Sequence, residues 1–511
     1  MENRRVRVRF APSPTGPLHM GGVRTALYNY LFAKKHHGDF ILRIEDTDQN
    51  RFVPGAEEYI VESLKWCNIL PDEGVGFADA GYGPYRQSER KPIYRAYAEK
   101  LIANGNAYYA FDTPDDLEEM RNRLSAAGVA SPQYNAISRQ SMKNSLTLSE
   151  DEVKKRLEAG EAYVIRIKIP RNEEIKLHDI IRGWVVVHSG QMDDKVLFKS
   201  DGMPTYHLAN VVDDYLMKIT HVIRGEEWLP SAPLHVLLYR YMDWESVMPQ
   251  FAHLPLLLKP DGNGKLSKRD GDRLGFPVFP LEWHDPVTKE VSSGYREKGY
   301  FPQAFVNMLS LLGWNPGTPQ EIFSMEELIQ AFSLERVNKS GAKFDPTKAG
   351  WFNQQYLRME TNESLTEKLK PVLSENGISA QEEFIAKVCE LMKERATFVK
   401  DIWIEGKYFF KVPEEYDKEA INKKWKPETS SLLAEWKTIL NDLPDFSPLA
   451  IEQTFKDFLE TKKTGMGAVL LPFRLAVTGV GAGPSIFEIS ALLGRDEVVK
   501  RIQKAVETIE V

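Results

Sequence analysis

The N-terminal part of the chain alternates between predicted strands and predicted helices. Residues 4–10 alternate charged and apolar side chains, so that the apolar ones share one face, which predicts a strand. Apolar residues then recur at helical spacing over residues 23–31, and residues 40–44 form a second apolar run. Pro54 stands where a further helix would begin. This order of elements is typical of a parallel, doubly wound sheet.

The pattern changes twice further along the chain. Residues 84–208 mix predicted helices with short strands, which indicates an α+β module inserted into the first domain. Apolar runs return near residue 209, and from about residue 320 the periodicity is mostly helical. Residues 282–300 are polar and without clear periodicity, which predicts a surface excursion. We therefore expect an α/β fold with a parallel, doubly wound domain, an α+β insertion and an all-α C-terminal part.

Length and composition restrict the class of protein. A chain of 511 residues is too long for one ordinary domain, since domains run roughly 100–200 residues. With 42% hydrophobic and 27% charged residues, the chain resembles neither a disordered nor a fibrous protein. No apolar run approaches the ~18 residues that a membrane helix needs, and residues 1–6 lack the apolar core of a secretory signal. Cys67 and Cys389 are expected to be buried thiols in a cytoplasmic protein.

Net charge does not decide whether the chain binds nucleic acid. The formal net charge is −7, which does not favour such binding. A local basic face would be enough for it, so the class stays open.

A first candidate site lies between the first predicted strand and the first predicted helix. Ligands of parallel sheets bind where strands end and helix N-termini offer free N–H groups to phosphates. Gly21 and Gly22 would let a nucleotide approach the backbone, and His19 could donate to a phosphate oxygen. The segment matches neither the dinucleotide fingerprint nor the P-loop. A simple Pro/Gly turn with a surface histidine is the alternative.

The second candidate is the segment Lys265-Leu266-Ser267-Lys268-Arg269, in a loop rich in Gly and Asp from residue 260 to residue 271. Three cations and a hydroxyl in a flexible loop suit a lid that holds a polyphosphate, although a solvated basic turn has the same composition. The two segments together favour adenylyl transfer, in which cations and N–H groups stabilise charge that develops on phosphate.

The same segments resemble the two signatures of class I aminoacyl-tRNA synthetases. Residues 19–22, HMGG, are similar to the family's HIGH signature, and residues 265–269, KLSKR, to its KMSKS signature. Longer strings resemble the bacterial-type glutamyl-tRNA synthetases over nearly the whole chain. These strings are Arg9 with PSPTG (12–16), RIEDTD (43–48), YRQSER (85–90), KSDGMPTYHLAN (199–210) and VIRGEEWL (222–229).

The resemblance implies a division into domains. Residues 1–83 and 209–246 would form the Rossmann-like catalytic domain, interrupted by an acceptor-stem-binding insertion at 84–208. Residues 247–322 would form a stem-contact domain that carries the KLSKR loop, and residues 323–382 and 383–511 would form helical anticodon-binding domains. Glutaminyl-tRNA synthetases share the catalytic half but end in β-barrels, so the helical C-terminal half argues against them.

The resemblance also assigns roles to individual residues. Catalytic roles fall to His19, Lys265 and Lys268. The residues implied to bind ATP are His19, Gly21, Gly22, Glu227, Trp228, Leu229, Lys265, Ser267 and Lys268. Those implied to bind glutamate are Arg9, Ala11, Ser13, Glu45, Tyr206, Asn210 and Arg224. Arg358 would contact the tRNA anticodon.

Ordinary structural explanations exist for several of these residues. Glu45 could cap a helix or pair with Arg43, and Arg224 could pair with Glu226 or Glu227. Trp228 could be a core residue. Arg358 could pair with Glu360 or with a phosphate.

The activity implied is ligation of L-glutamate to tRNA(Glu) through a glutamyl-adenylate, with ATP and Mg²⁺, by a monomer. Many relatives carry a Cys/His zinc cluster in the insertion. No cysteine lies between Cys67 and Cys389, so we expect no structural zinc here. Two other classes stay open: a small-molecule nucleotidyltransferase and a catalytically inactive RNA-binding relative. The length beyond residue 320 argues against the first, and the intact His19, Lys265 and Lys268 argue against the second.

Overall fold

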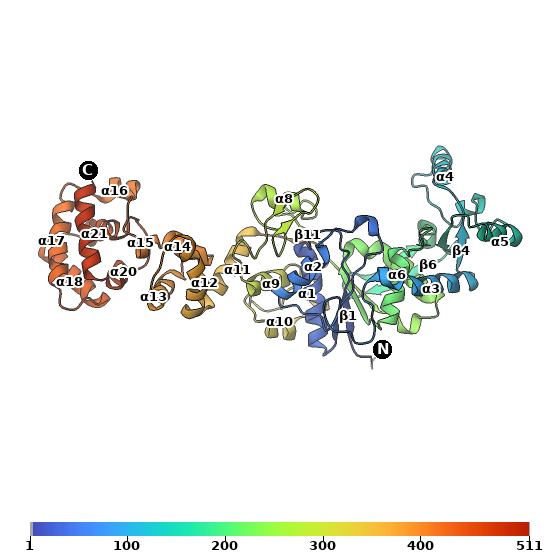
Figure 1. Ribbon diagram of the computed structural model, residues 1–511, viewed down its shortest axis with the longest axis horizontal. Coiled ribbons are helices and arrows are strands. Elements are labelled where there is room, and N and C mark those ends of the chain that lie inside the picture. The colour runs from blue at the N-terminus through green and yellow to red at the C-terminus, as the bar shows by residue number, and fades with distance from the viewer. Residues whose placement is uncertain (1–3, 510–511) are drawn as a thin grey trace. The chain divides into compact units, whose positions relative to one another are not determined.

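The computed structural model describes residues 4–509, drawn in Figure 1, and the chain divides into two compact units, Met1–Phe352 and Asn353–Val511. The strands, all in the first unit, are β1 (Arg7–Phe10), β2 (Asp39–Leu42), β3 (Glu73–Gly74), β4 (Ala107–Ala110), β5 (Val164–Ile167), β6 (Glu174–Asp179), β7 (Gly183–His188), β8 (Val196–Phe198), β9 (His221–Gly225), β10 (Gln250–Leu254), β11 (Leu257–Leu258), β12 (Trp283–His284), β13 (Val291–Ser292) and β14 (Ala342–Lys343).

The helices of the first unit are α1 (Met20–Lys35), α2 (Ala56–Trp66), α3 (Lys91–Ala103), α4 (Pro114–Ala126), α5 (Glu150–Glu158), α6 (Tyr206–Leu216), α7 (Ala232–Tyr241), α8 (Lys268–Leu274), α9 (Pro302–Ser310) and α10 (Met325–Ala331). Helix α11 (Pro346–Met359) spans the boundary between the units.

A parallel sheet forms the core of the first unit. Strands β1, β2 and β3 pair in parallel, and β9, β10 and β6 form a second parallel set, to which β7 adds an antiparallel edge. The two sets meet where the Thr220 N–H donates to the Arg7 carbonyl oxygen over 2.9 Å. The layer therefore runs β3-β2-β1-β9-β10-β6-β7, which confirms the predicted α/β class with a parallel sheet.

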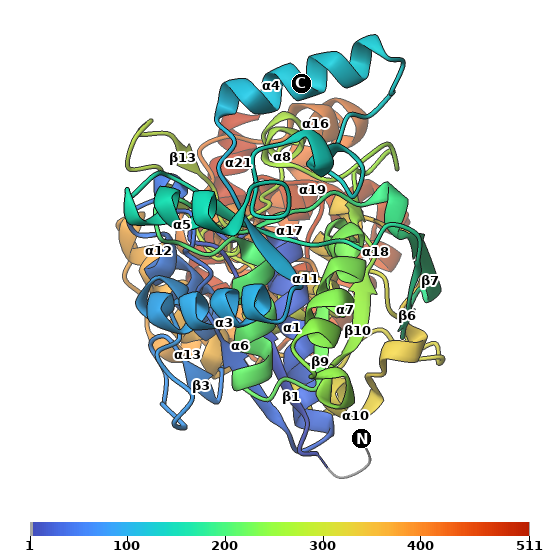
Figure 2. The same cartoon turned by 90° about the vertical axis from the view of Figure 1, so that its right-hand side faces the viewer.

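Helices cover both faces of this layer. Helix α1 packs on β1, β2 and β9, and α9 and α10 pack against α1. On the opposite side α6 packs on α7 and α3 (Figure 2). Because helices lie on both faces, all four residues of β1 are buried, including Arg7 and Arg9. The alternation over residues 4–10 predicted one apolar face; the charged positions of β1 are buried as well, and they are paired with acidic residues.

The predicted insertion contains a small module of its own. Strands β4, β5 and β8 form an antiparallel sheet, which is grouped with α4 and α5 in Figure 1. However, β6 and β7, which lie inside residues 84–208, extend the central sheet through β10. The chain thus returns to the core before residue 209, and the return was missed because an edge hairpin has the same local pattern in either sheet.

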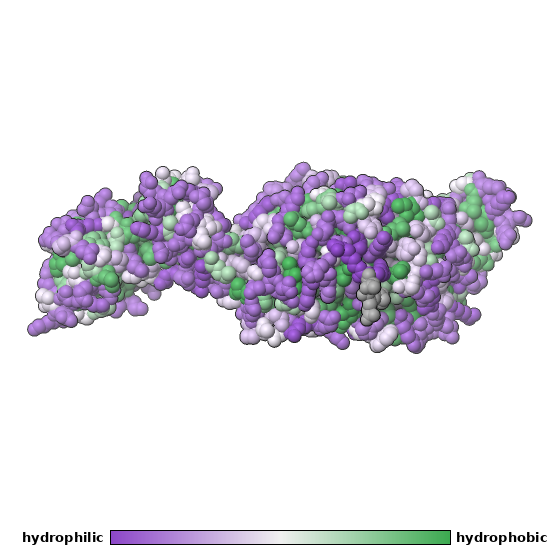
Figure 3. Space-filling model, turned by 90° about the horizontal axis from the view of Figure 1, so that it is seen from below, coloured by the Kyte–Doolittle hydropathy of each residue, from purple (hydrophilic) through white to green (hydrophobic). Residues whose placement is uncertain are grey.

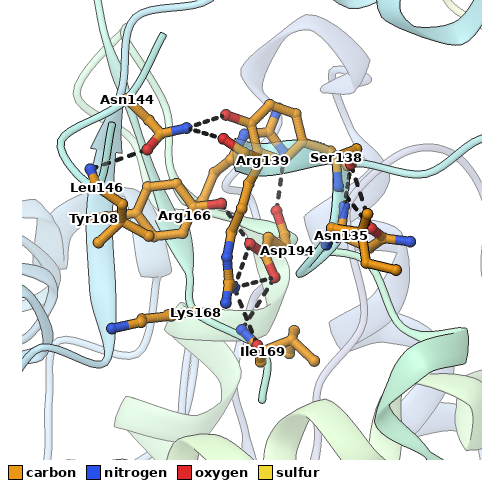
Figure 4. Close-up of polar contacts among 12 residues, drawn as sticks. Tyr108, Asn135, Ser138, Arg139, Asn144, Leu146, Arg166, Lys168, Ile169 and Asp194 are labelled. Carbon is orange, nitrogen blue, oxygen red and sulfur yellow. Dashed lines mark hydrogen bonds and ion pairs between the residues drawn. The ribbon is translucent and has the colours of Figure 1, made fainter. Parts of the chain in front are cut away.

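Polar contacts hold this module together (Figure 4). The buried Asp194 accepts from Tyr108 Oη, from Arg139 Nη1 over 3.0 Å and from the Ile169 N–H over 3.0 Å. Within residues 4–509, no three His, Cys, Asp or Glu side chains lie close enough to hold a metal ion. The absence of zinc stays a prediction, which elemental analysis of the purified, chelator-treated chain would test.

The second unit is helical after α11. Its helices are α12 (Asn362–Glu375), α13 (Glu382–Met392), α14 (Val399–Glu405), α15 (Lys407–Phe410), α16 (Lys418–Lys424), α17 (Thr429–Asp442), α18 (Pro448–Thr461), α19 (Met466–Thr478), α20 (Ile486–Leu493) and α21 (Arg495–Thr508). The all-α C-terminal part is therefore confirmed.

The division of the chain differs from the predicted limits. Residues 323–352 belong to the first unit, where α10 packs on α1, and α13 packs on α12 across the predicted limit at residue 382. Periodicity identifies a helix but not the surface on which it packs, so the predicted domain limits stay predictions.

The surface is mostly polar. On the face shown in Figure 3, apolar residues form small separate patches among polar ones. Over residues 4–509, no helix combines the length and the apolar character needed to cross a membrane.

Candidate active site

Several of the predicted site residues follow the carboxyl ends of three neighbouring strands. The loop with Ala11, Ser13 and His19 follows β1, Glu45 follows β2, and Glu227 and Trp228 follow β9. Because these strands are parallel and adjacent, their ends meet at one edge of the sheet, where ligands bind in folds of this class.

His19 caps the N-terminus of α1. Its Nδ1 accepts a hydrogen bond from the Gly21 N–H over 3.2 Å. Burial, with a smaller effect from Lys265, lowers the pKa of His19 to about 4, so the ring is neutral at pH 7. Since Nδ1 accepts, the proton sits on Nε2, which is buried and has no hydrogen-bond partner in the protein. The ring therefore presents an unused donor to a ligand.

A cavity of about 590 Å³ opens beside this histidine. Its lining includes His19, Gly21, Gly22, Glu227, Lys265 and Lys268. Gly22 is held in a tight place, because a Cβ on it would lie 2.5 Å from Leu18 Cδ1. Six of the residues predicted to bind ATP are thus brought to one cavity.

The KLSKR segment is more ordered than predicted. Helix α8 begins at Lys268, and Ser267 forms a capping box with Asp270, so the predicted loop ends before residue 271. Both lysines contact acidic groups: Lys265 Nζ lies 3.5 Å from Glu227 Oε1, and Lys268 Nζ lies 3.0 Å from Glu290 Oε2. The Ser267 hydroxyl serves the helix cap, and its predicted contact with ATP would compete with that bond.

The segment 282–300 is mostly exposed, as expected, but it also contributes to the site. It forms the hairpin β12–β13, and Trp283, Asp285 and Ser292 line the same cavity as His19. The Ser292 hydroxyl is buried and has no partner in the protein, as for His19 Nε2. Nothing in the sequence indicated that this hairpin lines a cavity, because its two strands are too short to show periodicity.

A second, smaller cavity of about 230 Å³ adjoins the first, since both are lined by Ser13, Gly22 and Glu227. All seven residues predicted to bind glutamate line it: Arg9, Ala11, Ser13, Glu45, Tyr206, Asn210 and Arg224. They come from β1, the loop after it, the end of β2, helix α6 and β9. The structure thus gathers residues that are separated by more than 200 positions.

Buried charges on one side of this cavity hold each other in place. Asp214 Oδ1 accepts from Arg9 Nε over 3.0 Å and from Arg43 Nη1 over 2.8 Å. Glu45 Oε1 accepts from Arg43 Nη2 and from Asn210 Nδ2, both over 3.0 Å. Burial raises the pKa of Glu45 above its ordinary value, and the opposite effect of Arg43 and Arg9 only partly offsets this rise. A cation beside Glu45 would therefore be stabilised by that carboxylate.

Arg43 and Asp214 were not predicted as site residues. The sequence offered pairing with Arg43 as an alternative to a functional role for Glu45. The structure contains this ion pair, and it orients the carboxylate that lines the cavity, so the two roles are compatible. The signal for Asp214 was the pair of adjacent acidic residues, Asp213 and Asp214, that follows the apolar residues Val211 and Val212 on helix α6.

Arg224 also lines the smaller cavity. Its Nη1 donates to Tyr206 Oη over 2.7 Å, and its Nε donates to His253 Nε2 over 3.0 Å. Glu226 pairs with Arg182, and Glu227 lies near Lys265, so the acidic neighbours expected for Arg224 contact other cations.

Besides Ser267, two residues predicted to bind ATP are not among those that line the larger cavity. The Trp228 ring packs on Tyr206, with ring centroids 4.3 Å apart, and lines the smaller cavity. Leu229 is not among the residues that line either cavity. Their roles toward ATP stay predictions.

Arg358 lies in the second unit, on α11. Its Nη2 donates to the Glu394 carbonyl oxygen over 2.6 Å, and its Nε lies 3.2 Å from Glu394 Oε2. The alternative partner Glu360 contacts Ser364 and Lys368 instead. Arg358 thus ties α11 to the residues after α13, and its contact with tRNA stays a prediction.

Comparison with known proteins identifies the family. Residues 5–351 match the family model "tRNA synthetases class I (E and Q), catalytic domain", and residues 364–506 match "Anticodon binding domain". The glutamate–tRNA ligase of Cytophaga hutchinsonii is 58% identical over 508 residues, 99% of this chain and 98% of that protein. The chain belongs to the class I glutamate–tRNA ligases.

Further relatives of this family align over the full length. The glutamate–tRNA ligase of Phocaeicola vulgatus is 57% identical over 511 residues, all of both chains. The crystal structure of a glutamate tRNA ligase from Elizabethkingia meningosepticum, in complex with its amino acid, superimposes with a TM-score of 0.95 at 52% identity. It covers 99% of this chain and 100% of its own. The resemblance found from the two signatures is therefore confirmed.

Proposed function

We propose that this chain ligates L-glutamate to tRNA(Glu) in two steps, through a glutamyl-adenylate. Membership of the family supports the reaction class. The observation that carries the substrate is the smaller cavity, which brings Arg224, Arg9 and Glu45 together and opens beside the His19 cavity. Arginine binds a carboxylate through two parallel N–H donors, and Glu45 offers a carboxylate to an ammonium group.

The first step joins glutamate to AMP. The α-carboxylate oxygen of glutamate attacks the α-phosphorus of ATP, and pyrophosphate leaves with the electron pair of the broken P–O bond. His19 donates from Nε2 to a phosphate oxygen, and Lys265 and Lys268 leave Glu227 and Glu290 to stabilise charge on the phosphates. Mg²⁺ would accompany ATP, bound mostly by phosphates and water.

The second step transfers glutamate to tRNA. A hydroxyl of the 3′-terminal adenosine attacks the adenylate carbonyl, an ester bond forms, and AMP leaves. The protein supplies orientation in this step rather than a covalent nucleophile. The helical second unit, which matches an anticodon-binding model, would hold the far end of the tRNA.

Pyrophosphate–ATP exchange tests the proposal. Exchange should require glutamate and, as the family implies, tRNA. Exchange with glutamate absent, or with another small molecule in its place, would favour the nucleotidyltransferase alternative. No exchange under any condition would favour an inactive RNA-binding relative.

Arg358 would contribute to reading the anticodon. A guanidinium donor suits the carbonyl of cytosine and conflicts with the donors of guanine. Arg358→Gln should then raise charging of tRNA(Gln) and leave adenylate formation unchanged at saturating tRNA. The contacts with Glu394 support a structural role for Arg358 as the alternative. In that case the substitution should reduce charging of both tRNAs equally. Aminoacylation of the two tRNAs across a salt series decides between them.

A further inference from the structure

Two buried residues stand behind Arg224, on the side away from the smaller cavity's lining. His253 belongs to β10 and Asp179 ends β6, and both are fully buried. The His253 Nδ1 lies 2.6 Å from Asp179 Oδ2, and the His253 Nε2 lies 3.0 Å from Arg224 Nε. Neither residue lines the smaller cavity. The row Asp179–His253–Arg224 thus reaches the cavity only through the arginine.

Local contacts fix which way each group in this row faces. Asp179 Oδ1 accepts from the N–H groups of Ile181 over 3.0 Å and Arg182 over 2.8 Å. The His253 backbone N–H lies 3.3 Å from Oδ1 and 3.2 Å from Oδ2, and Oδ2 is the oxygen that faces the imidazole. Since a carboxylate only accepts, His253 Nδ1 carries the proton, and Nε2 offers a lone pair to Arg224 Nε. Burial lowers the pKa of His253, which keeps the ring neutral.

The remaining donors of Arg224 are also directed. Nη1 donates to Tyr206 Oη over 2.7 Å, and Nη2 donates to the Trp228 carbonyl oxygen over 3.3 Å. His235 Nδ1 lies 3.5 Å from Nη1. Tyr206 and Trp228 line the cavity themselves, whereas the bond at Nε comes from the protein interior. That bond therefore sets the plane of the guanidinium independently of what occupies the cavity.

We propose that Asp179 and His253 are positioning residues that hold the Arg224 guanidinium in the orientation required to bind the side-chain carboxylate of glutamate. They set the selectivity of the site without touching the substrate. This inference rests on the proposed function and deepens it. An arginine that is free to rotate about its long side chain would lose part of its geometric preference for a planar carboxylate.

Asp179→Asn tests the direction of the hydrogen bonds. The asparagine keeps the shape and, with Oδ1 still accepting from the backbone, turns an NH₂ donor toward His253 Nδ1. The imidazole must then carry its proton on Nε2 and face Arg224 Nε with a donor. With ¹⁵N-labelled histidine, NMR should show His253 protonated at Nδ1 in the wild type and at Nε2 in the variant.

Kinetic measurements then show whether the hydrogen bond between Arg224 Nε and His253 Nε2 affects selectivity for glutamate. Asp179→Asn and His253→Leu should raise KM for glutamate by about 10–100-fold, the size typical of partners that orient a binding group. KM for ATP should stay unchanged, and the preference for glutamate over glutamine should fall. His253→Gln, whose amide oxygen can accept from Arg224, should recover part of the loss. His221→Leu is the matched control, because His221 is a mostly buried histidine of β9 that packs on Phe32.

Two results would overturn the inference. One is a tautomer change in Asp179→Asn with unchanged KM and selectivity for glutamate. The other is a rise in KM for glutamate on His253→Leu that is equally large in the wild type and in an Arg224→Gln background. Residues that act through Arg224 should have no further effect once that arginine has been replaced. Wild-type exchange without glutamate would instead overturn the proposed function, so the two failures are distinguishable.

Discussion

The two cavities of the site are built in opposite ways. Around the smaller one the charged side chains are buried: the Arg9 side chain is 4% exposed and pairs with Asp214, which is 2% exposed. Around the larger one, the Lys265 side chain is 61% exposed and Lys268 is 38% exposed, and their partners Glu227 and Glu290 are 45% and 67% exposed. The first set comes from the central sheet and the helix on it, and the second from a loop, a short helix and a hairpin.

This difference indicates how each substrate would be bound. Buried, interlocked charges are already oriented, so a small amino acid is recognised with little rearrangement. Exposed ion pairs are worth only about 0–1 kcal/mol, so the lysines can leave their carboxylates for phosphate groups at little cost. The amino-acid pocket would be preformed, and the nucleotide side would adjust when ATP binds.

The largest effect should come from removing the buried arginine of the smaller cavity. Arg224→Gln should reduce the preference for glutamate over glutamine by about 10⁴-fold, because the site loses the partner of a charged group. The kcat/KM values for the two amino acids check this. A preference equal to that of the wild type would show that Arg224 is structural and would remove the basis for contrasting the two cavities.

Lys268→Ala addresses the exposed side. It should slow adenylate formation by about 10²–10³-fold, the usual effect of removing one group that stabilises transition-state charge. Since Lys268 is half-exposed, thermal unfolding should change little. Single-turnover measurement of adenylate with unchanged rate would show that this lysine is only a solvated residue.

Acid should destabilise the protein through its partly buried histidines. Burial is the main cause that lowers the pKa of His19, His207 and His221 to about 4, from 6.5 in the unfolded chain. Between these pH values the unfolded state binds more protons than the folded state. The contribution of these histidines to the free energy of unfolding should therefore be fully present above pH 6.5 and be lost as the pH falls toward 4. Urea unfolding midpoints at pH 7.5 and 5 measure this. His221→Leu should flatten the dependence, and a wild-type midpoint independent of pH would contradict it.

The smallest effect should come from the partner of Lys268. Glu290→Gln removes an exposed carboxylate, which should lower KM for ATP by no more than about 5-fold, equivalent to the ~1 kcal/mol limit for a surface pair. KM for glutamate should not change. A larger effect, or one on glutamate, would mean that the hairpin β12–β13 acts on both cavities.

Sequence reasoning located most of what lies in one continuous segment. The helical spacing over residues 23–31 lies within α1, and the apolar run at residues 40–44 overlaps β2. The strand at residues 4–10 was found, but its burial on both faces was not, because charged side chains at alternate positions look solvent-exposed until their acidic partners are known. The seven residues predicted to bind glutamate, all of which line the smaller cavity, were predicted from the resemblance and not from periodicity.

What was missed depends on contacts between distant segments. Asp179 stands in a region assigned to the insertion, and only the pairing of β6 with β10 brings it to His253. Ser292 lies in a segment without periodicity, and only its packing against the cavity shows that its hydroxyl faces a ligand site.

The sequence by itself determined the family, the class of fold and the two signatures, because strand and helix periods and short motifs are local properties of the chain. The tertiary structure alone decided which charges pair, where the hairpin at residues 282–300 lies and what orients Arg224. The physical reason is that the energy of a buried charge depends on the partners that folding places within a few ångströms, and these partners are remote in sequence.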